Sequence, residues 1–179
     1  MRSTFLVLIL ILGSAAMAAA QQVPAIEVSG AYQFSPKPHS YNGDISDGLN
    51  RHGWAASLVR NFDDVFGLEF NTNGSYGKVN TEETSGTAAV HGFMGGPRFS
   101  YREKESFAPY GRALVGLVHR KVSGVSDSFL AAQLGGGLTL FTSSRMGLVA
   151  GGDYRRNWHG LKWDDFTVYV GISFRKRSE

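Results

Sequence analysis

The chain has 179 residues and a formal net charge of +3, with 42% apolar residues, 18% charged residues and no cysteine. This length fits one domain with a core or a small barrel, and the small charge gives no reason to expect a nucleic-acid partner. The lack of cysteine excludes disulfides, cysteine-bound metal ions and a lipoprotein anchor. The 23 glycines and five prolines, without a collagen repeat, favour a turn-rich all-β chain.

The first residues have the three parts of a secretory signal peptide. A basic start is followed by the apolar run from Phe5 to Leu12 and by the small residues Ala18 to Ala20. This order predicts that residues 1–20 are cleaved during secretion. An N-terminal membrane anchor is the alternative, but the apolar run is short and is interrupted at Gly13.

The last predicted strand, residues 165–174, shows the pattern that recurs along the mature chain. Its large apolar residues alternate with small or polar ones: Phe166, Val168, Val170, Ile172 and Phe174 against Thr167, Tyr169, Gly171 and Ser173. Because side chains alternate across a strand, one face is apolar and the other is mostly polar. About ten residues is also the length of a strand that crosses a bilayer at a tilt.

Seven earlier segments show the same alternation. In chain order they are residues 26–34, 54–62, 66–73, 89–101, 107–119, 129–140 and 146–155. The predicted connections are long at 35–53, 74–87, 120–128 and 156–164, and short at 63–65, 102–106 and 142–145. Short turns on one side, longer loops on the other and an even number of strands are typical of an outer-membrane barrel. A soluble β-sandwich is the alternative, but it does not need its loops segregated in this way.

Aromatic residues gather at both ends of the predicted strands. Tyr32, Phe34, Trp54, Tyr154 and Phe166 lie at the long-loop end, and Phe62, Phe66, Tyr101, Phe107 and Phe174 lie at the short-turn end. Two such rings are typical of aromatic girdles at the two membrane interfaces. Aromatic caps on a soluble core are the alternative. Arg60 falls on the apolar face beside a turn, where its side chain can reach the lipid headgroups.

The polar face carries three acids and three arginines: Glu27, Glu69, Asp153, Arg98, Arg112 and Arg155. Asn61, Asn71 and Gln133 share that face. Strands in hydrocarbon must close into a barrel to pair their backbone groups, and side chains just fill the interior of an eight-stranded barrel. We therefore predict a buried network of paired charges that plugs the lumen for structural reasons. An ion path is the alternative, although the inward positions Met94, Leu114 and Val149 argue against a wide channel.

Three short stretches carry a resemblance to a known family. They are Gly53-Trp54-Ala55-Ala56-Ser57 leading to Asn61-Phe62, Gly67-Leu68-Glu69, and Gly96-Pro97-Arg98-Phe99-Ser100-Tyr101. With the strand pattern over nearly the whole mature chain, they resemble the OmpA-like eight-stranded outer-membrane β-barrel domain family. The resemblance implies insertion into the bacterial outer membrane, both termini in the periplasm and loops displayed outside. It also implies recognition of the C-terminal strand by the outer-membrane assembly machinery, although here Phe174 is followed by five further residues.

Other motifs give weaker signals. The five histidines show no metal-ligand spacing along the chain, so we expect no metal site and no cofactor. Asp63-Asp64 and Asp164-Asp165 are predicted to be turn or cap residues. The stretch from Gly135 to Gly137 lies inside a predicted strand and opens no helix, so it is not a phosphate-binding loop.

Two other protein classes remain as alternatives. A lipid-modifying barrel enzyme would use His39-Ser40 with Asp44, or His119 with Ser123 and Asp127. A soluble lipocalin-like carrier would need an apolar interior and a polar exterior, the reverse of the predicted faces.

The sequence thus predicts an all-β protein, an eight-stranded antiparallel up-and-down transmembrane β-barrel over residues 21–179, with short periplasmic turns and longer extracellular loops. Its partner is the outer-membrane lipid bilayer, and we expect a monomer without catalytic residues. The expected role is structural, surface-interacting or permeability to small solutes.

Overall fold

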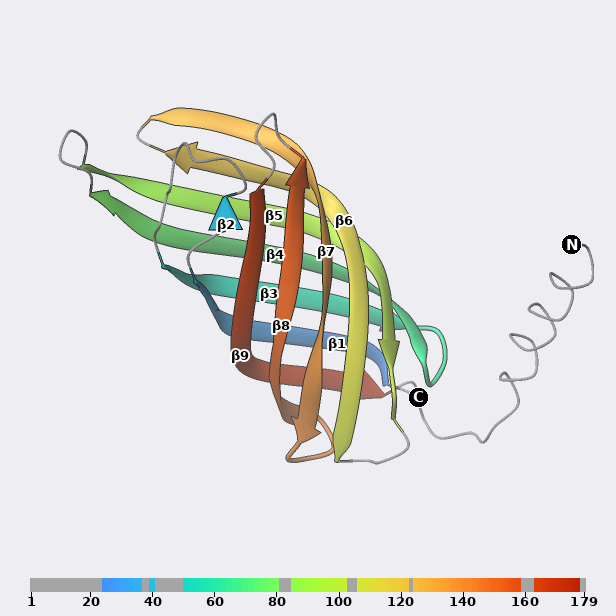
Figure 1. Ribbon diagram of the computed structural model, residues 1–179. Coiled ribbons are helices and arrows are strands. Elements are labelled where there is room, and N and C mark those ends of the chain that lie inside the picture. The colour runs from blue at the N-terminus through green and yellow to red at the C-terminus, as the bar shows by residue number, and fades with distance from the viewer. Residues whose placement is uncertain are drawn as a thin grey trace, which may run out of the picture.

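The computed structural model describes residues 24–36, 39–40, 50–80, 85–102, 106–122, 124–158 and 163–177. The predicted signal peptide, residues 1–20, lies outside this part of the chain. Within the described residues, no helix is long and apolar enough to cross a membrane. The regular elements there are strands, and they form a single antiparallel sheet (Figure 1).

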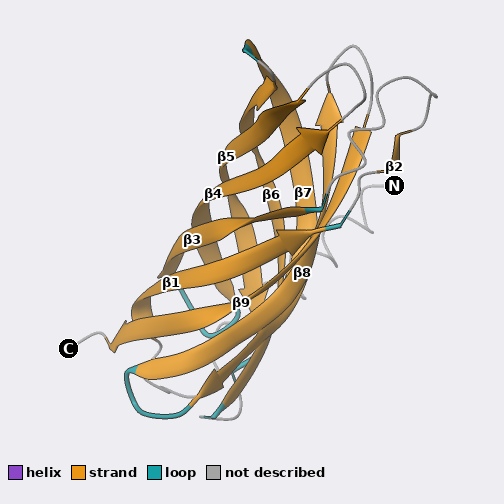
Figure 2. Ribbon diagram, turned by 90° about the vertical axis from the view of Figure 1, so that its left-hand side faces the viewer, coloured by secondary structure: helices purple, strands orange, loops and turns teal. Residues whose placement is uncertain are grey.

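The strands are β1 (Pro24–Ser35), β2 (His39–Ser40), β3 (Arg51–Asn61), β4 (Phe66–Asn80), β5 (Ser85–Ser100), β6 (Phe107–Val122), β7 (Val125–Phe141), β8 (Met146–Trp158) and β9 (Trp163–Arg177). From β3 onward each strand pairs with the next, β1 pairs with β3, and β9 pairs back with β1. The sheet therefore closes on itself, and Figure 2 shows how its strands are tilted. The short β2 pairs only with the first two residues of β9 and is not part of the barrel wall. The predicted eight-stranded antiparallel barrel is confirmed.

The strand register sorts the side chains onto two faces. Val28, Leu58 and Phe70 are partners across β1, β3 and β4, and each is about half exposed on the outside. Along β9, Phe166 is likewise exposed, whereas its neighbour Thr167 is buried. A soluble monomer rarely exposes a continuous apolar patch larger than roughly a few hundred Å². This apolar wall therefore suits the hydrocarbon of a bilayer, as the alternating sequence predicts.

The predicted boundaries of the long loops are wrong. We refer to the end with connections 62–65, 101–106 and 142–145 as the turn end and to the opposite end as the loop end. At the loop end, β4 and β5 occupy most of the predicted loop 74–87, and β6 and β7 most of the predicted loop 120–128. The hairpin of β6 and β7 is paired up to Val122 and Val125, and Gly124 has a φ of 92° in its turn. β3 starts before the predicted end of loop 35–53, and β8 and β9 both extend into loop 156–164.

The strands run past their predicted ends because the backbone ladder does not need apolar side chains to continue. Past the apolar wall, outward positions carry polar residues such as Lys78 and Lys121, so the period of two disappears from the sequence while the ladder persists. β4 has no β3 partner after Tyr76, and β7 has no β8 partner before Leu130. Four strands, β4 to β7, therefore project beyond their neighbours at the loop end (Figure 1).

Two glycines make room for the side chains inside the barrel. A Cβ on Gly135 would overlap the Asp153 carboxylate, and a Cβ on Gly151 would overlap the Tyr169 hydroxyl. Small residues in the walls of β7 and β8 thus let large polar side chains pack directly against the backbone.

Candidate functional site

The six charged residues predicted on the polar face all lie inside the barrel. Glu27, Glu69, Arg98, Arg112, Asp153 and Arg155 are each between 2% and 7% exposed, and Asn61, Asn71 and Gln133 are buried with them. Arg51 and Asp165 are equally buried, and Arg102 reaches inward from the connection after β5. Among the described residues, the interior ion pairs join four carboxylates to five arginines in three clusters, and Arg98 links two of them.

The cluster at the turn end is built on Glu27 of β1. Its Oε1 accepts hydrogen bonds of 2.8 Å from Arg102 Nη2 and from Asn61 Nδ2. Arg102 also donates to the Asn61 side-chain oxygen and to the Asp64 backbone carbonyl, each at 2.8 Å. Arg98 Nη2 lies 3.8 Å from Glu27 Oε2 and connects this cluster to the next. The sequence places Arg102 in a turn and gives no sign that its side chain folds inward.

The central cluster holds Arg112 of β6 between two acids. Arg112 donates to Asp153 twice, from Nε to Oδ1 at 3.0 Å and from Nη2 to Oδ2 at 2.6 Å. Its Nη1 donates to Glu69 Oε1. Glu69 also accepts a bond of 2.8 Å from Ser57 Oγ, and its Oε2 lies 3.5 Å from Arg98 Nη1. Two parallel bonds to one carboxylate fix the guanidinium plane, so Arg112 is held in a single position.

The cluster at the loop end depends on Asp165 of β9. Its carboxylate pairs with Arg51 and lies 3.0 Å from Arg155 Nη2. Arg155 Nη1 also donates to Asn73 Oδ1 at 3.2 Å. The prediction that Asp165 is a turn or cap residue is wrong, because β9 begins at Trp163 and Asp165 falls on its inward face. Arg51 was missed because it lies in the predicted loop 35–53, although it shares the inward parity of β3.

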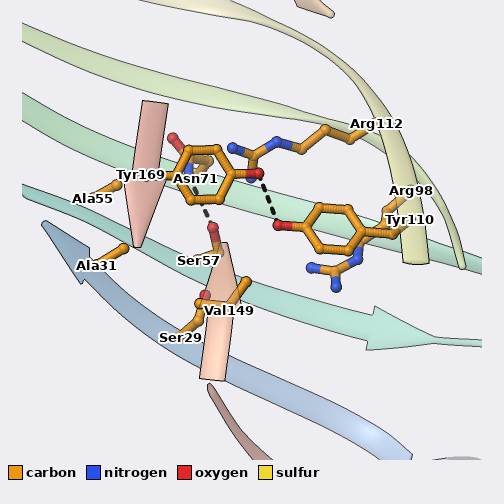
Figure 3. A pocket seen from close by; sticks show the side chains of 10 residues that line it. All are labelled: Ser29, Ala31, Ala55, Ser57, Asn71, Arg98, Tyr110, Arg112, Val149 and Tyr169. Atoms are coloured by element: carbon orange, nitrogen blue, oxygen red, sulfur yellow. Dashed lines mark hydrogen bonds between the residues drawn. The ribbon is translucent and has the colours of Figure 1, made fainter. Parts of the chain in front are cut away.

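Two tyrosines close the middle of the lumen (Figure 3). Tyr110 and Tyr169 are buried, and their hydroxyl oxygens are 2.7 Å apart. The Arg98 guanidinium carbon lies 3.7 Å from the centroid of the Tyr110 ring, and that of Arg112 lies 5.0 Å from the centroid of the Tyr169 ring. Both distances are within the range of cation–π attraction. The sequence pattern did not single out Tyr110, although this residue shares the inward parity of Arg112 on β6.

Little space remains between these side chains. Two cavities of about 10 Å³ each lie in the interior, one lined by the two tyrosines and the other beside Arg155 and Gln133. One water molecule needs about 10–15 Å³ of such space. Each of these two cavities can therefore hold about one water.

The predicted girdle aromatics lie on the outer wall. Tyr32, Trp54, Phe62, Tyr101, Phe107, Tyr154, Phe166 and Phe174 are exposed, and Phe34 and Phe66 are half-buried. Phe66 is covered by Phe62 and Phe99, with ring centroids 5.8 and 5.6 Å away. Phe166 and Phe174 are separated by roughly 26 Å along β9, or roughly 20 Å of membrane thickness at the usual strand tilt. The role of these aromatics as interfacial girdles stays a prediction.

In the enzyme alternative, the candidate catalytic residues His119 and Asp127 lie on opposite faces of the sheet. His119 pairs with Ser128, and its Nδ1 lies 2.9 Å from the Ser128 hydroxyl. Asp127 is one residue earlier on β7 and pairs with Arg120, so it falls on the opposite face of the sheet from His119. Ser123, Asp44 and the side chains of His39 and Ser40 lie outside the described residues.

The fold agrees with a comparison against protein families. The family model for the outer membrane protein beta-barrel domain matches residues 5–174. The chain belongs to this family. The match confirms the resemblance inferred from the sequence, and it includes all of β1 to β8 and most of β9. Among curated proteins, none matches the chain.

Solved outer-membrane barrels share the fold. Neisserial surface protein A aligns with a TM-score of 0.67 and 14% identity over 84% of this chain and 97% of its own. Ail, the attachment invasion locus protein of Yersinia pestis, was solved with the heparin analogue sucrose octasulfate. It aligns with a TM-score of 0.60 and 18% identity over 84% of this chain and 97% of its own. OprG of Pseudomonas aeruginosa aligns with a TM-score of 0.58 and 10% identity over 86% of this chain and 96% of its own. At these identities the likeness is one of fold.

Proposed function

We propose that this family member is an outer-membrane barrel with a closed lumen that acts through the surface at its loop end. The observation that supports a closed lumen is the packing of the interior, where the cavities found among the three ion-pair clusters are of about 10 Å³ each. A solute would have to break several buried ion pairs at once, and breaking one such pair costs about 3–5 kcal/mol. This favours a structural and surface-interaction role over permeability.

The proposed orientation puts the turn end in the periplasm and the loop end outside the cell. The family and the short connections at the turn end support it. The projecting parts of β4 to β7 would then stand above the outer leaflet and offer a rigid surface for contacts. The complex of Ail with a heparin analogue supports a surface-interaction role for a barrel of this fold.

No catalysis is proposed, because His119 and Asp127 lie on opposite faces of the sheet. A lipocalin-like carrier is disfavoured by the apolar exterior and the charged interior. We also propose that residues 1–20 are removed during secretion and that the assembly machinery recognises β9. A monomer is proposed because the pairing of β9 with β1 leaves no free edge within the barrel wall.

Liposome swelling tests the closed lumen. The mature protein is reconstituted into liposomes, its folding is verified by heat-modifiable gel mobility, and the uptake of arabinose is compared with that of liposomes containing a general porin. We expect no more swelling than in protein-free liposomes. The variant Arg98→Ser/Arg112→Ser, which empties the centre of the lumen, should swell faster if it folds. Porin-like swelling of the unmodified barrel would overturn the proposal.

Cysteine labelling tests the orientation, because the natural chain has no cysteine. Val125→Cys places a thiol at the exposed tip of the β6–β7 hairpin, and Ser144→Cys places one in the exposed β7–β8 turn. In intact cells, a membrane-impermeant maleimide should label the Val125→Cys variant and not the Ser144→Cys variant. The opposite result would reverse the orientation and remove the proposed surface role of the loop end.

A further inference from the structure

Two histidines lie next to each other on the outer wall near the loop end. His91 of β5 and His119 of β6 are direct cross-strand partners. The Cβ atoms of such partners are about 4.5–5.5 Å apart and point to the same side of the sheet. Both side chains here are on the outward face, where His119 is exposed and His91 is half-buried. Two imidazoles at this separation can reach one metal ion that approaches from the aqueous side of the interface.

Each imidazole has one nitrogen held by a hydroxyl from the strand on its far side. His91 Nε2 lies 3.0 Å from Tyr76 Oη of β4, and His119 Nδ1 lies 2.9 Å from Ser128 Oγ of β7. Tyr76 is itself oriented, because its hydroxyl accepts a bond of 3.4 Å from Trp54 Nε1. The strands β4 and β7 flank the β5–β6 pair on opposite sides, so the two rings are positioned from outside the pair.

The other nitrogen of each ring faces the gap between β5 and β6. His91 Cδ2 lies 3.1 Å from the point where a Cβ on Gly74 of β4 would stand, so the Cδ2–Nε2 edge is turned toward β4. In an imidazole Nδ1 is on the opposite edge, and that edge of His91 is turned toward β6. His119 has its Nδ1 toward β7, so its Cδ2–Nε2 edge is turned toward β5. His91 Nδ1 and His119 Nε2 thus converge on the same gap.

We propose that His91 Nδ1 and His119 Nε2 bind a divalent transition-metal ion, with Tyr76 and Ser128 as positioning residues. Imidazole suits Cu²⁺, Ni²⁺ and Zn²⁺, and a metal-binding histidine usually donates its second N–H to an oxygen. Here Nε2–H of His91 would donate to Tyr76, and Nδ1–H of His119 to Ser128. No group of three or more His, Asp or Glu that could hold a metal occurs among the described residues, so water completes the coordination.

The spacing of histidines along the chain does not indicate this site, because its two ligands come from neighbouring antiparallel strands. A metal ion bound there would link β5 to β6 where the strands leave the apolar wall. Binding would therefore tie together the two hairpins that project at the loop end.

The test is the titration of the folded mature barrel in detergent with Cu²⁺, which binds nitrogen ligands most tightly of the divalent first-row ions. Electron paramagnetic resonance reports how many nitrogens coordinate the copper. We expect one Cu²⁺ per barrel at this pair with two-nitrogen coordination, and a higher temperature for the heat-induced gel mobility shift. His91→Asn and His119→Asn should each weaken binding by about tenfold or more, since outer-shell changes alone cost about 10–100-fold.

The matched control is His52→Asn. His52 is also outward and exposed, and its Nδ1 contacts the Tyr32 hydroxyl, but its cross-strand partners are Phe34 and Tyr76. The His52→Asn variant should bind Cu²⁺ like the unmodified protein. Any binding of Cu²⁺ at the chain's amino terminus is common to all variants and does not affect their comparison. Tyr76→Phe should weaken binding with no change in the mobility of the metal-free barrel. Equal affinity in the unmodified protein and both single variants, or an equal loss in His52→Asn, would overturn the proposal.

Discussion

Neighbouring residues of β9 meet opposite environments. Val170 is 57% exposed on the outer wall, whereas Tyr169 is 8% exposed inside the barrel. Val170 needs only a lipid environment, so another apolar residue of similar size would serve there. Tyr169 has a hydroxyl partner in Tyr110 and the Arg112 guanidinium over its ring. The comparison indicates that apolar wall residues such as Val170 act one by one and that inward residues act as members of a set.

The largest effect is expected where an inward residue has the most partners. Glu69→Ala removes the carboxylate shared by Arg98, Arg112 and Ser57, and leaves buried guanidinium groups without full compensation. We expect the free energy of unfolding to fall by about 3–5 kcal/mol. Urea-induced unfolding in lipid vesicles, followed by tryptophan fluorescence, measures this change.

The control for Glu69→Ala is an acid of the same chain that lies outside the set. Asp127 is exposed near the tip of the β6–β7 hairpin, and Asp127→Ala should cost less than about 1 kcal/mol. An equally small loss in Glu69→Ala would show that the interior charges are not coupled.

The next effect tests the outer wall. Val115 is 64% exposed on β6 within the apolar band, and Val115→Lys puts a charge into hydrocarbon. The expected cost at mid-bilayer is about 2–4 kcal/mol, read from the same unfolding measurement. Val125→Lys is the matched control, because Val125 is 68% exposed at the hairpin tip beyond the wall. Normal stability of Val115→Lys in lipid would contradict the assignment of the outward face.

The same difference explains what could be predicted from the sequence. Along each strand, apolar outward residues alternate with polar or small inward residues, and this local pattern was sufficient to predict eight strands and their faces. The burial of Glu69 and Arg112 follows from parity alone. The partners of Glu69 and Arg112 cannot be predicted from parity, because the pairing depends on which strands face each other across the lumen.

The predicted boundaries of the loop-end segments are wrong for another reason. Lys78 and Lys121 lie on strand positions beyond the apolar wall, so the alternation ends while the strands continue. The sequence places Asp165 at the start of the predicted strand 165–174 and, with Asp164, predicts it to be a turn or cap residue. Its parity with Thr167 and Tyr169 was the available sign that it faces the interior.

An intermediate effect is expected for this reassigned residue. Asp165→Asn leaves Arg51 and Arg155 sharing a neutral amide in place of a carboxylate. Because hydrogen bonds to charged groups are lost inside the barrel, unfolding should become about 1–3 kcal/mol easier. The neighbouring Asp164 falls on the other face of β9, so Asp164→Asn should change the same quantity by less than about 1 kcal/mol. A similar loss of unfolding free energy in the two variants would indicate that Asp165 acts as a cap residue and not as part of the interior cluster.

The smallest expected effect gives the sharpest test of a coupled interior. Tyr110→Phe and Tyr169→Phe each remove one hydroxyl from the pair and leave the other without its 2.7 Å partner. Each should cost about 0.5–1.5 kcal/mol, measured by unfolding in vesicles. When both partners of a buried hydrogen bond are replaced by apolar groups, the change can be nearly neutral. The double variant should therefore lose less stability than the sum of the single variants, whereas two outward substitutions far apart should simply add. Additivity at the tyrosine pair would mean that these inward residues act one by one, as distant apolar residues of the outer wall do.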